Sequence, residues 1–214
     1  TVFNGAGVSS SAAYELLICQ VQNHYYNDGK IDAVTLAKIG QFSENVYFGK
    51  PSGLLDQSGI ALGGISAIDF EDPENPVVQS LGRSLGDLSV VLINTGSHAN
   101  LTADYAAIRS EMEEVAAFFG KKVLREVSRE EFLAALPQLK GKVSGRAILR
   151  AMHFFDENDR VDELKAAIEA NDAKKIKDVI NRSGESSANL LQNYFVAGDV
   201  EQGIALAVNF ANAL

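Results

Sequence analysis

Apolar positions in the first fifty residues recur at helical spacing and are separated by glycine-rich breaks. Residues 10–27 show a mostly apolar helical surface, followed by the turn signal Asn27-Asp28-Gly29. A second stretch of this kind predicts a helix over 33–48, with Asp32 as its N-cap. The break at 49–53 contains two glycines and a proline. The pattern therefore predicts two helices joined by a turn.

The next segment shows shorter apolar runs that are typical of strands. Residues 59–70 are expected to be extended, with a bend at Gly63-Gly64. Two prolines and four acidic residues then predict a surface loop over 69–76. The β-branched run 88–94 predicts a buried strand. Strands are thus expected between two helical regions.

The pattern becomes mostly helical again after residue 101. Thr102 is a candidate cap for a helix that ends before Gly120, and Ser128 and Glu131 have the spacing of a capping box. An α+β fold is the expected class. Further helices are predicted over 144–156, 159–170, 172–182 and 201–213.

Composition limits the classes of function. The 214 residues are 46% apolar and carry a net charge of −9. An acidic chain without a run of Lys and Arg argues against a nucleic-acid partner. No apolar run approaches the roughly 20 residues of a membrane span, so no membrane partner is expected. One cysteine fits a reducing compartment, and the expected location is cytoplasmic.

A glycine- and serine-rich loop near the start of the chain is the first candidate site. Two closely spaced glycines and three hydroxyls precede a helix, and a helix N-terminus binds phosphate through backbone N–H groups. A serine-rich helix cap is the alternative, and the loop is not a Walker A sequence. No strand precedes it, so we expect the chain to be a piece of a longer protein. The loop consists of Gly5, Ala6, Gly7, Val8, Ser9, Ser10 and Ser11.

Two carboxylates form the second candidate site. Asp56 follows a glycine-rich break between leucines, as expected for a partly buried base. Glu44 lies late in the second predicted helix. A carboxylate there could bind Mg²⁺, which in nucleotide sites takes one or two carboxylates together with phosphate oxygens. The alternatives are an ordinary helix-face charge for Glu44 and a helix N-cap for Asp56.

Two further polar segments carry candidate residues. A predicted strand enters a polar loop that contains His98 and then the first turn of a helix with Tyr105. Such loops often carry binding residues, but a packed Tyr at a helix end is the alternative. Arg150, His153 and Glu157 lie on one helix face, which we interpret as a structural polar face because metal-ligand spacing is lacking.

Taken in order, these four segments resemble the GHMP small-molecule kinases, and the galactokinases most closely. Residues 5–12 are similar to the family's Gly-x-Gly-Leu-Ser-Ser-Ser-Ala motif, with Val8 in place of Leu. The later marks are Leu-Thr-x-x-Tyr at 101–105 and Arg-x-x-His-x-x-x-Glu-x-x-Arg at 150–160. A Gln-x-x-Glu helix leading into Gly-x-x-x-Gly-x-x-Asp-Gln is matched by Gln41, Glu44, Gly49, Gly53, Asp56 and Gln57.

The resemblance implies a role for each candidate residue. Asp56 resembles the base that takes the proton from the C1 hydroxyl of galactose, and Gly53 and Tyr105 resemble contacts of that sugar. Residues 5–11 resemble the ATP phosphate cradle, and Ser10 and Glu44 resemble the Mg²⁺ partners. The implied reaction converts galactose and ATP to galactose 1-phosphate and ADP.

The resemblance also implies a two-part architecture. Residues 1–60 would end the N-terminal, ATP-binding domain, and residues 61–214 would form most of a helix-rich C-terminal domain packed on an antiparallel sheet. The family's N-terminal sugar-binding signature and C-terminal glycine-rich motif are absent from this sequence, so we expect these 214 residues alone to be inactive. A kinase for another sugar, a non-catalytic ligand sensor and a folded module without activity remain the alternatives. The sequence leaves the oligomeric state open.

Overall fold

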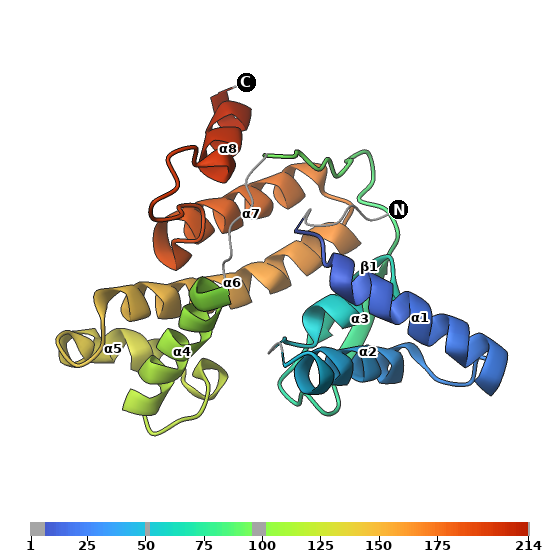
Figure 1. Ribbon diagram of the computed structural model, residues 1–214. Helices are drawn as coiled ribbons and strands as arrows, with labels where there is room; N and C mark the ends of the chain where they lie inside the picture. The colour runs from blue at the N-terminus through green and yellow to red at the C-terminus, as the bar shows by residue number, and fades with distance from the viewer. Residues whose placement is uncertain (1–6, 50–51, 96–101, 214) are drawn as a thin grey trace. The chain divides into compact units, whose positions relative to one another are not determined.

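The chain divides into two compact units, residues 1–85 and residues 86–214. The structure, a computed structural model, describes residues 7–49, 52–95 and 102–213 (Figure 1). Each unit is described below by itself. The expected domain boundary near residue 60 stays a prediction.

Three packed helices and a β-hairpin form the first unit. Asp32 accepts a hydrogen bond from the Thr35 amide at 3.0 Å, so the predicted N-cap of the second helix is confirmed. The turn before it is also confirmed, because Asp28 ends the first helix with a left-handed backbone. The elements are α1 (Ser10–Asn27), α2 (Ala33–Phe42), the π-helical turn η1 (Ser43–Tyr47), α3 (Leu55–Leu62), β1 (Ile65–Asp69) and β2 (Val77–Gly82).

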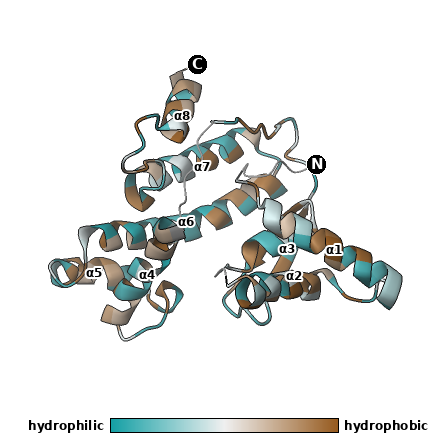
Figure 2. Ribbon diagram, in the orientation of Figure 1, coloured by the Kyte–Doolittle hydropathy of each residue, from teal (hydrophilic) through white to brown (hydrophobic). Residues whose placement is uncertain are grey.

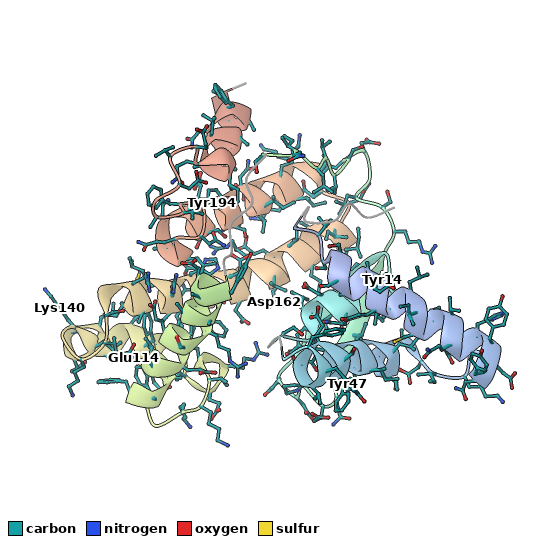
Figure 3. The ribbon with its side chains drawn as sticks, in the orientation of Figure 1. Tyr14, Tyr47, Glu114, Lys140, Asp162 and Tyr194 are labelled. Carbon is teal, nitrogen blue, oxygen red and sulfur yellow. The ribbon has the colours of Figure 1, made fainter. Side chains whose placement is uncertain are left out.

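The helices of this unit bury a small apolar core. Its members are short or aliphatic side chains, which let the three helices approach closely: Ala12, Leu16, Leu36, Ala37 and Leu54. Many larger apolar side chains are exposed, among them Tyr14 on α1 and Tyr47 in η1 (Figure 3). Beyond the helices, β1 and β2 pair in an antiparallel ladder with an irregularity between Ile65 and Ser66. The loop between these strands is the predicted acidic surface loop.

The extended structure predicted for 59–70 is confirmed only over residues 65–69, and the strand predicted for 88–94 is wrong. Residues 59–62 belong to helix α3, and extended structure begins only at Ile65, after Gly63 and Gly64 with φ of +62° and +65°. A short apolar run fits either a helix or a strand, and Leu54, packed in the core, lets α3 start early. Residues 88–94 form no strand, and Val90 and its neighbours are exposed. A strand needs a partner for its backbone hydrogen bonds; Leu88 makes only an isolated bridge, and neither β1 nor β2 pairs with the rest of this run.

In the described part of the second unit all regular structure is helical. Its core gathers Phe132 and Leu139 with Val115 and Ala147, all with at most 1% of their surface exposed. The Ser128–Glu131 capping box is confirmed, with both reciprocal hydrogen bonds present. The elements are α4 (Thr102–Phe118), the 3₁₀ turn η2 (Leu124–Glu126), α5 (Arg129–Leu139), α6 (Gly145–Glu169), α7 (Ala173–Ser186), the π-helical turn η3 (Ser187–Leu191) and α8 (Gly203–Ala213).

Helix α6 replaces two predicted helices. The expected break between 156 and 159 is absent, because the intervening residues include neither Gly nor Pro and because Glu157 pairs with Arg160 within the helix. Polar and apolar segments alternate along α6 in Figure 2. The helix therefore contributes both to the core and to a buried polar face.

The α+β fold class is confirmed: the residues that the structure describes are mostly helical and include one small antiparallel sheet. Within the described residues, none of the helices combines the length and the apolar character needed to span a membrane.

Candidate functional site

The N-terminus of α1 carries the described part of the predicted phosphate loop. Gly7 has φ of +70° and Ser9, at the N-cap, has φ of +56°, so two residues of this loop adopt left-handed backbone. The capping alternative is wrong for Ser9, because its side chain makes no capping hydrogen bond. The first turn of a helix has N–H groups without intrahelical acceptors and a partial positive charge. Gly5 and Ala6 lie outside the described residues.

Glu44 lies in the π-helical turn that continues α2. The turn is marked by a hydrogen bond from the Phe48 amide to the Ser43 carbonyl, five residues back. Glu44 is only 4% exposed, so the alternative of an ordinary helix-face charge is wrong. The Gln57 Nε2 group donates a hydrogen bond to Glu44 Oε2 at 3.2 Å. A buried carboxylate thus meets a buried amide from α3.

The segment before α3 is held against α2 and η1 by side-chain amides. Asn45 Oδ1 accepts from the Ser52 amide at 2.7 Å, and Gln41 Nε2 donates to the Ser52 carbonyl at 3.2 Å. These bonds tie down the backbone immediately before Gly53 and the start of α3. Loops fixed in this way present functional groups with little loss of entropy on binding.

Asp56 lies in the first turn of α3 and is exposed, so the expected partial burial is wrong for the chain as described. The N-cap alternative is wrong too, because the N-cap residue is Leu54. Leu54 is buried and anchors the helix start, which leaves Asp56 facing solvent. Gly53, which is also predicted to contact the sugar, is exposed too.

Helices α1, α2 and α3 meet at Gly40. A Cβ atom at that position would lie 2.6 Å from Leu16 Cδ2 and 3.2 Å from Gln57 Cγ. The close approach explains why a glycine stands in the middle of α2. The described phosphate-loop residues, Glu44 and Asp56 therefore belong to one tightly packed unit of three helices.

The donor set fits a magnesium ion of the kind that binds nucleotides. Among the residues that the structure describes, no group of three or more His, Cys, Asp or Glu side chains gathers as a metal cage. Mg²⁺ in nucleotide sites takes only one or two protein ligands and completes its shell with phosphate oxygens and water. A single buried carboxylate such as Glu44 satisfies that requirement.

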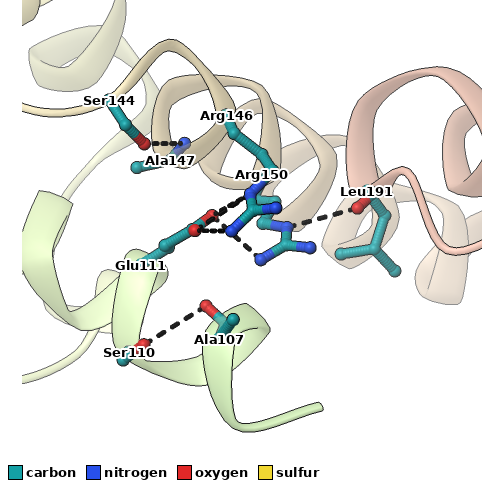
Figure 4. A network of polar contacts seen from close by, with 8 residues as sticks. All are labelled: Ala107, Ser110, Glu111, Ser144, Arg146, Ala147, Arg150 and Leu191. Atoms are coloured by element: carbon teal, nitrogen blue, oxygen red, sulfur yellow. Dashed lines mark hydrogen bonds and ion pairs between the residues drawn. The ribbon is translucent and has the colours of Figure 1, made fainter. Parts of the chain in front are cut away.

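Tyr105 lies on α4 in the second unit and its side chain is exposed. His98 lies outside the described residues. Two turns after Tyr105, Glu111 joins α4 to α6 (Figure 4). It accepts hydrogen bonds from Arg146 Nε at 2.9 Å and from Arg150 Nη1 at 2.9 Å. Burial by itself would raise the pKa of Glu111, but the Arg146 hydrogen bond and the Arg150 charge together hold that pKa below its usual value.

The polar face of α6 is confirmed as structural. His153 Nδ1 lies 2.9 Å from Ser186 Oγ on α7, and both side chains are buried. Glu157 accepts hydrogen bonds from Ser183 Oγ at 2.6 Å and from Arg160 Nε at 2.8 Å. Burial is the main cause that lowers the pKa of His153. The negative charges of Glu157 and Asp156 act to raise this pKa, and the positive charge of Arg160 acts to lower it. These contacts hold α6 and α7 together.

Sequence reasoning assigned no role to several residues that build the site. Gln57 appeared only as the residue after Asp56, although a zero exposed fraction makes it one of the most buried polar groups. Asn45 and Gln41 were not expected to tie the Ser52 backbone. One available signal was spacing, because Gln41 and Asn45 lie four residues apart on one helix face.

Comparisons with known proteins agree with the order of these motifs. Residues 1–64 match the family described as GHMP kinases N terminal domain. A galactokinase from Glaesserella parasuis serovar 5 (strain SH0165) is 33% identical over 184 residues, which is 85% of this chain and 47% of that protein. A galactokinase from Clostridium tetani (strain Massachusetts / E88) is 32% identical over 214 residues, with 96% of this chain and 53% of that protein covered.

A solved structure shows the same similarity in three dimensions. The crystal structure of Lactococcus lactis galactokinase complexed with galactose matches 88% of this chain and 49% of that chain, with a TM-score of 0.75 and 30% identity. The chain spans about half the length of the curated relatives it matches. The GHMP-kinase-like architecture expected from the motifs is therefore confirmed. Residues 1–64 thus match the GHMP kinases N terminal domain, and most of the chain is similar to about half of a galactokinase.

Proposed function

We propose that the protein carrying this chain is an ATP-dependent sugar kinase that phosphorylates the C1 hydroxyl of galactose. The products would be galactose 1-phosphate and ADP. The family match of residues 1–64 and the similarity to a galactokinase complexed with galactose support this proposal. By the same similarity, residues 1–60 would end the ATP-binding domain and residues 61–214 would form most of the C-terminal domain. The proposed location is the cytoplasm.

The nucleotide side of the site is assigned to α1 and η1. Residues 5–11 would hold the ATP phosphates through backbone N–H groups at the start of α1, where the helix dipole favours negative charge. Ser10 and Glu44 would hold Mg²⁺, which neutralises charge on the phosphates when it is bound. Phosphoryl transfer depends mainly on positioning and on charge neutralisation, so these groups need no covalent chemistry.

The sugar side is assigned to Gly53, Asp56 and Tyr105. The Asp56 carboxylate would accept the proton of the C1 hydroxyl as its oxygen attacks the γ-phosphorus in line with the leaving ADP oxygen. The ties from Gln41 and Asn45 to Ser52 hold the backbone beside Gly53 and Asp56 in place. Such positioning is a large part of the rate that a kinase provides.

One observation carries the proposal furthest. Consecutive residues of α3 differ in burial, since Asp56 is exposed to solvent while Gln57 is buried against Glu44. A single helix turn therefore presents a candidate base outward and contacts the candidate metal ligand inward. This pairing fits a site where a sugar hydroxyl and a metal-bound phosphate must meet.

Replacing Asp56 with Asn in the protein that carries this chain tests the assignment. We expect turnover of galactose to fall by at least about 100-fold, the lower end for loss of a general base. Because Asp56 is exposed, folding should be unaffected. Asp28→Asn is the matched control, since Asp28 is an exposed carboxylate of the same unit that contacts only Lys30 among the described ion pairs. Turnover close to wild type in Asp56→Asn would remove Asp56 as the base.

Two measurements separate the alternatives. A panel of sugars that includes N-acetylhexosamines and uronic acids identifies a kinase with another substrate. Galactose binding without ADP release would indicate a ligand sensor instead. We expect residues 1–214 alone to show no galactose-dependent ADP release, since they match only about half of the galactokinases.

A further inference from the structure

We propose that Gln57 is a positioning residue that fixes the orientation of the Glu44 carboxylate and thereby sets the affinity of the site for Mg²⁺. The inference rests on the proposed function, in which Glu44 holds the ion beside the ATP phosphates. Gln57 itself does not touch metal or substrate in this proposal. It acts through one hydrogen bond to the side chain that does.

The contact between the two side chains is fully enclosed. Gln57 has no exposed surface and Glu44 is 4% exposed, so water does not compete for their hydrogen bond. The Nε2 group of Gln57 donates to Glu44 Oε2 at 3.2 Å. A hydrogen bond to an ionised carboxylate contributes more than one between neutral groups, because the donor dipole meets a full charge.

Electrostatics fixes which end of the amide faces the carboxylate. If the amide were rotated by half a turn, its carbonyl oxygen would face the Glu44 Oε2 acceptor and the two oxygens would repel. The observed orientation leaves Gln57 Oε1 buried, and no partner for it is found among the described residues. An unsatisfied buried acceptor costs about 1–3 kcal/mol. A side chain retained with that cost is consistent with a role in holding Glu44.

Packing removes the remaining freedom of the Gln57 side chain. Its Cγ atom lies against Gly40, where even a methyl group would come within 3.2 Å. Leu16 from α1 closes the same junction. Because three helices confine its stem, the amide keeps one position and so does the carboxylate that it binds.

A ligand held in this way binds metal more tightly than a freely rotating one. The bond to Gln57 uses Oε2 of Glu44 and restricts rotation of the carboxylate about its last bond. Removal of such an outer partner typically lowers metal affinity by about 10–100-fold. Galactose binding has no direct link to this contact and should be unchanged.

The test is a Mg²⁺ titration of Gln57→Met in the protein that carries this chain. Met keeps the volume of the side chain and removes the donor. Binding of Mg²⁺ with a non-hydrolysable ATP analogue is measured by calorimetry, and Mn²⁺ binding by electron paramagnetic resonance. We expect the metal dissociation constant to rise about 10–100-fold with galactose affinity unchanged. Should Met prevent folding, Gln57→Asn draws the amide back by one methylene and is expected to act in the same direction.

The matched control is Asn23→Ala. Asn23 is another buried amide of the same unit, and within the described residues its side chain bonds only the Ile31 backbone and the Asn27 side chain. It should lower the melting temperature while leaving the metal titration at its wild-type value. Equal losses of metal affinity in both variants would mean that Gln57 is merely structural, and the proposal would fall.

A double-mutant cycle with Glu44→Gln tests whether Gln57 acts through Glu44. If it does, Gln57→Met causes no further loss of metal affinity once Glu44 has been replaced. A full additional loss overturns the proposal, as does an unchanged titration in Gln57→Met alone. If Glu44→Gln weakens Mg²⁺ binding but Gln57→Met does not, this inference is rejected and the proposed function still stands. If Glu44→Gln has no effect on metal, the magnesium assignment itself fails.

Discussion

Replacing Arg150 with Met removes one of the two cations that hold Glu111 between α4 and α6. Both arginines bond the same carboxylate, yet their surroundings differ greatly (Figure 4). The side chain of Arg150 is 4% exposed, that of Arg146 is 50% exposed and that of Glu111 is 15% exposed. Arg150 also donates to the Leu191 carbonyl at 3.2 Å, which ties η3 to the same point.

The difference in burial between Arg150 and Arg146 sets the expected loss of stability for each variant. Removal of one partner from a buried ion pair costs about 3–5 kcal/mol, since the remaining charge stays buried without full compensation. Arg146 still contacts Glu111 in the variant, so we expect about 3 kcal/mol, the lower end of that range. Arg146→Met removes an exposed cation and should cost at most about 1 kcal/mol.

Thermal unfolding followed by circular dichroism at 222 nm distinguishes the two variants. At roughly 2–4 °C per kcal/mol for a domain of this size, Arg150→Met should lower the melting temperature by about 6–12 °C. The control Arg146→Met should lower it by no more than about 4 °C. Because the folded-state pKa of Glu111 is lowered, its stabilisation is present above pH about 4.5 and is lost as the pH falls through the lowered value. The difference between wild type and Arg150→Met should therefore shrink at acid pH.

Two results would refute this reasoning. Equal destabilisation by Arg150→Met and Arg146→Met would show that burial does not decide the strength of the pair. A destabilisation by Arg150→Met that stays constant to pH 2 would show that the loss comes from packing of the side chain rather than from the charge of Glu111.

Three further predictions concern other parts of the chain. Gly40→Ala should destabilise the first unit by about 1–3 kcal/mol in denaturant unfolding, because the new Cβ atom would lie 2.6 Å from Leu16 Cδ2. Unchanged stability would mean that the Leu16 side chain moves aside without cost. Ser128→Ala should cost about 1 kcal/mol through loss of the capping box, measured in the same way, and a neutral result would contradict the cap. Burial lowers the pKa of His153 below its value in the unfolded chain, so the free energy of unfolding should fall as the pH drops below about 6.5. His153→Gln should remove this dependence of stability on pH. An unchanged dependence would exclude His153 as its source.

Sequence patterns predicted helices best where a cap and an apolar face agree. Asp32 and Ser128 marked helix starts because their side chains bond the backbone locally, without help from distant residues. The run 88–94 was misread, because β-branched content favours a strand only when another strand supplies hydrogen bonds. The division of α6 was misread because acidic residues near Glu157 resemble a loop, although ion pairs within the helix accommodate them.

The candidate site was predictable as a set of motifs but not as a set of contacts. Glu44 and Asp56 stood out as carboxylates at particular spacings, whereas the burial of Glu44 depends on the approach of α3. A glutamine after an aspartate reads as ordinary polar surface. Its position against Gly40 follows from the packing of three helices, which no local pattern specifies.

The π-helical turn η1 has a consequence for how this chain tolerates changes in length. Its hydrogen bond spans five residues, so the turn holds one residue more than an α-helical turn. Deleting that residue would restore a regular helix and rotate every following position by about 100°. Glu44 would then turn relative to Gln57, and Asn45 relative to Ser52. Insertions and deletions should accordingly accumulate in the acidic loop between β1 and β2 during evolution, while the length of the segment from Gln41 to Asp56 stays constant.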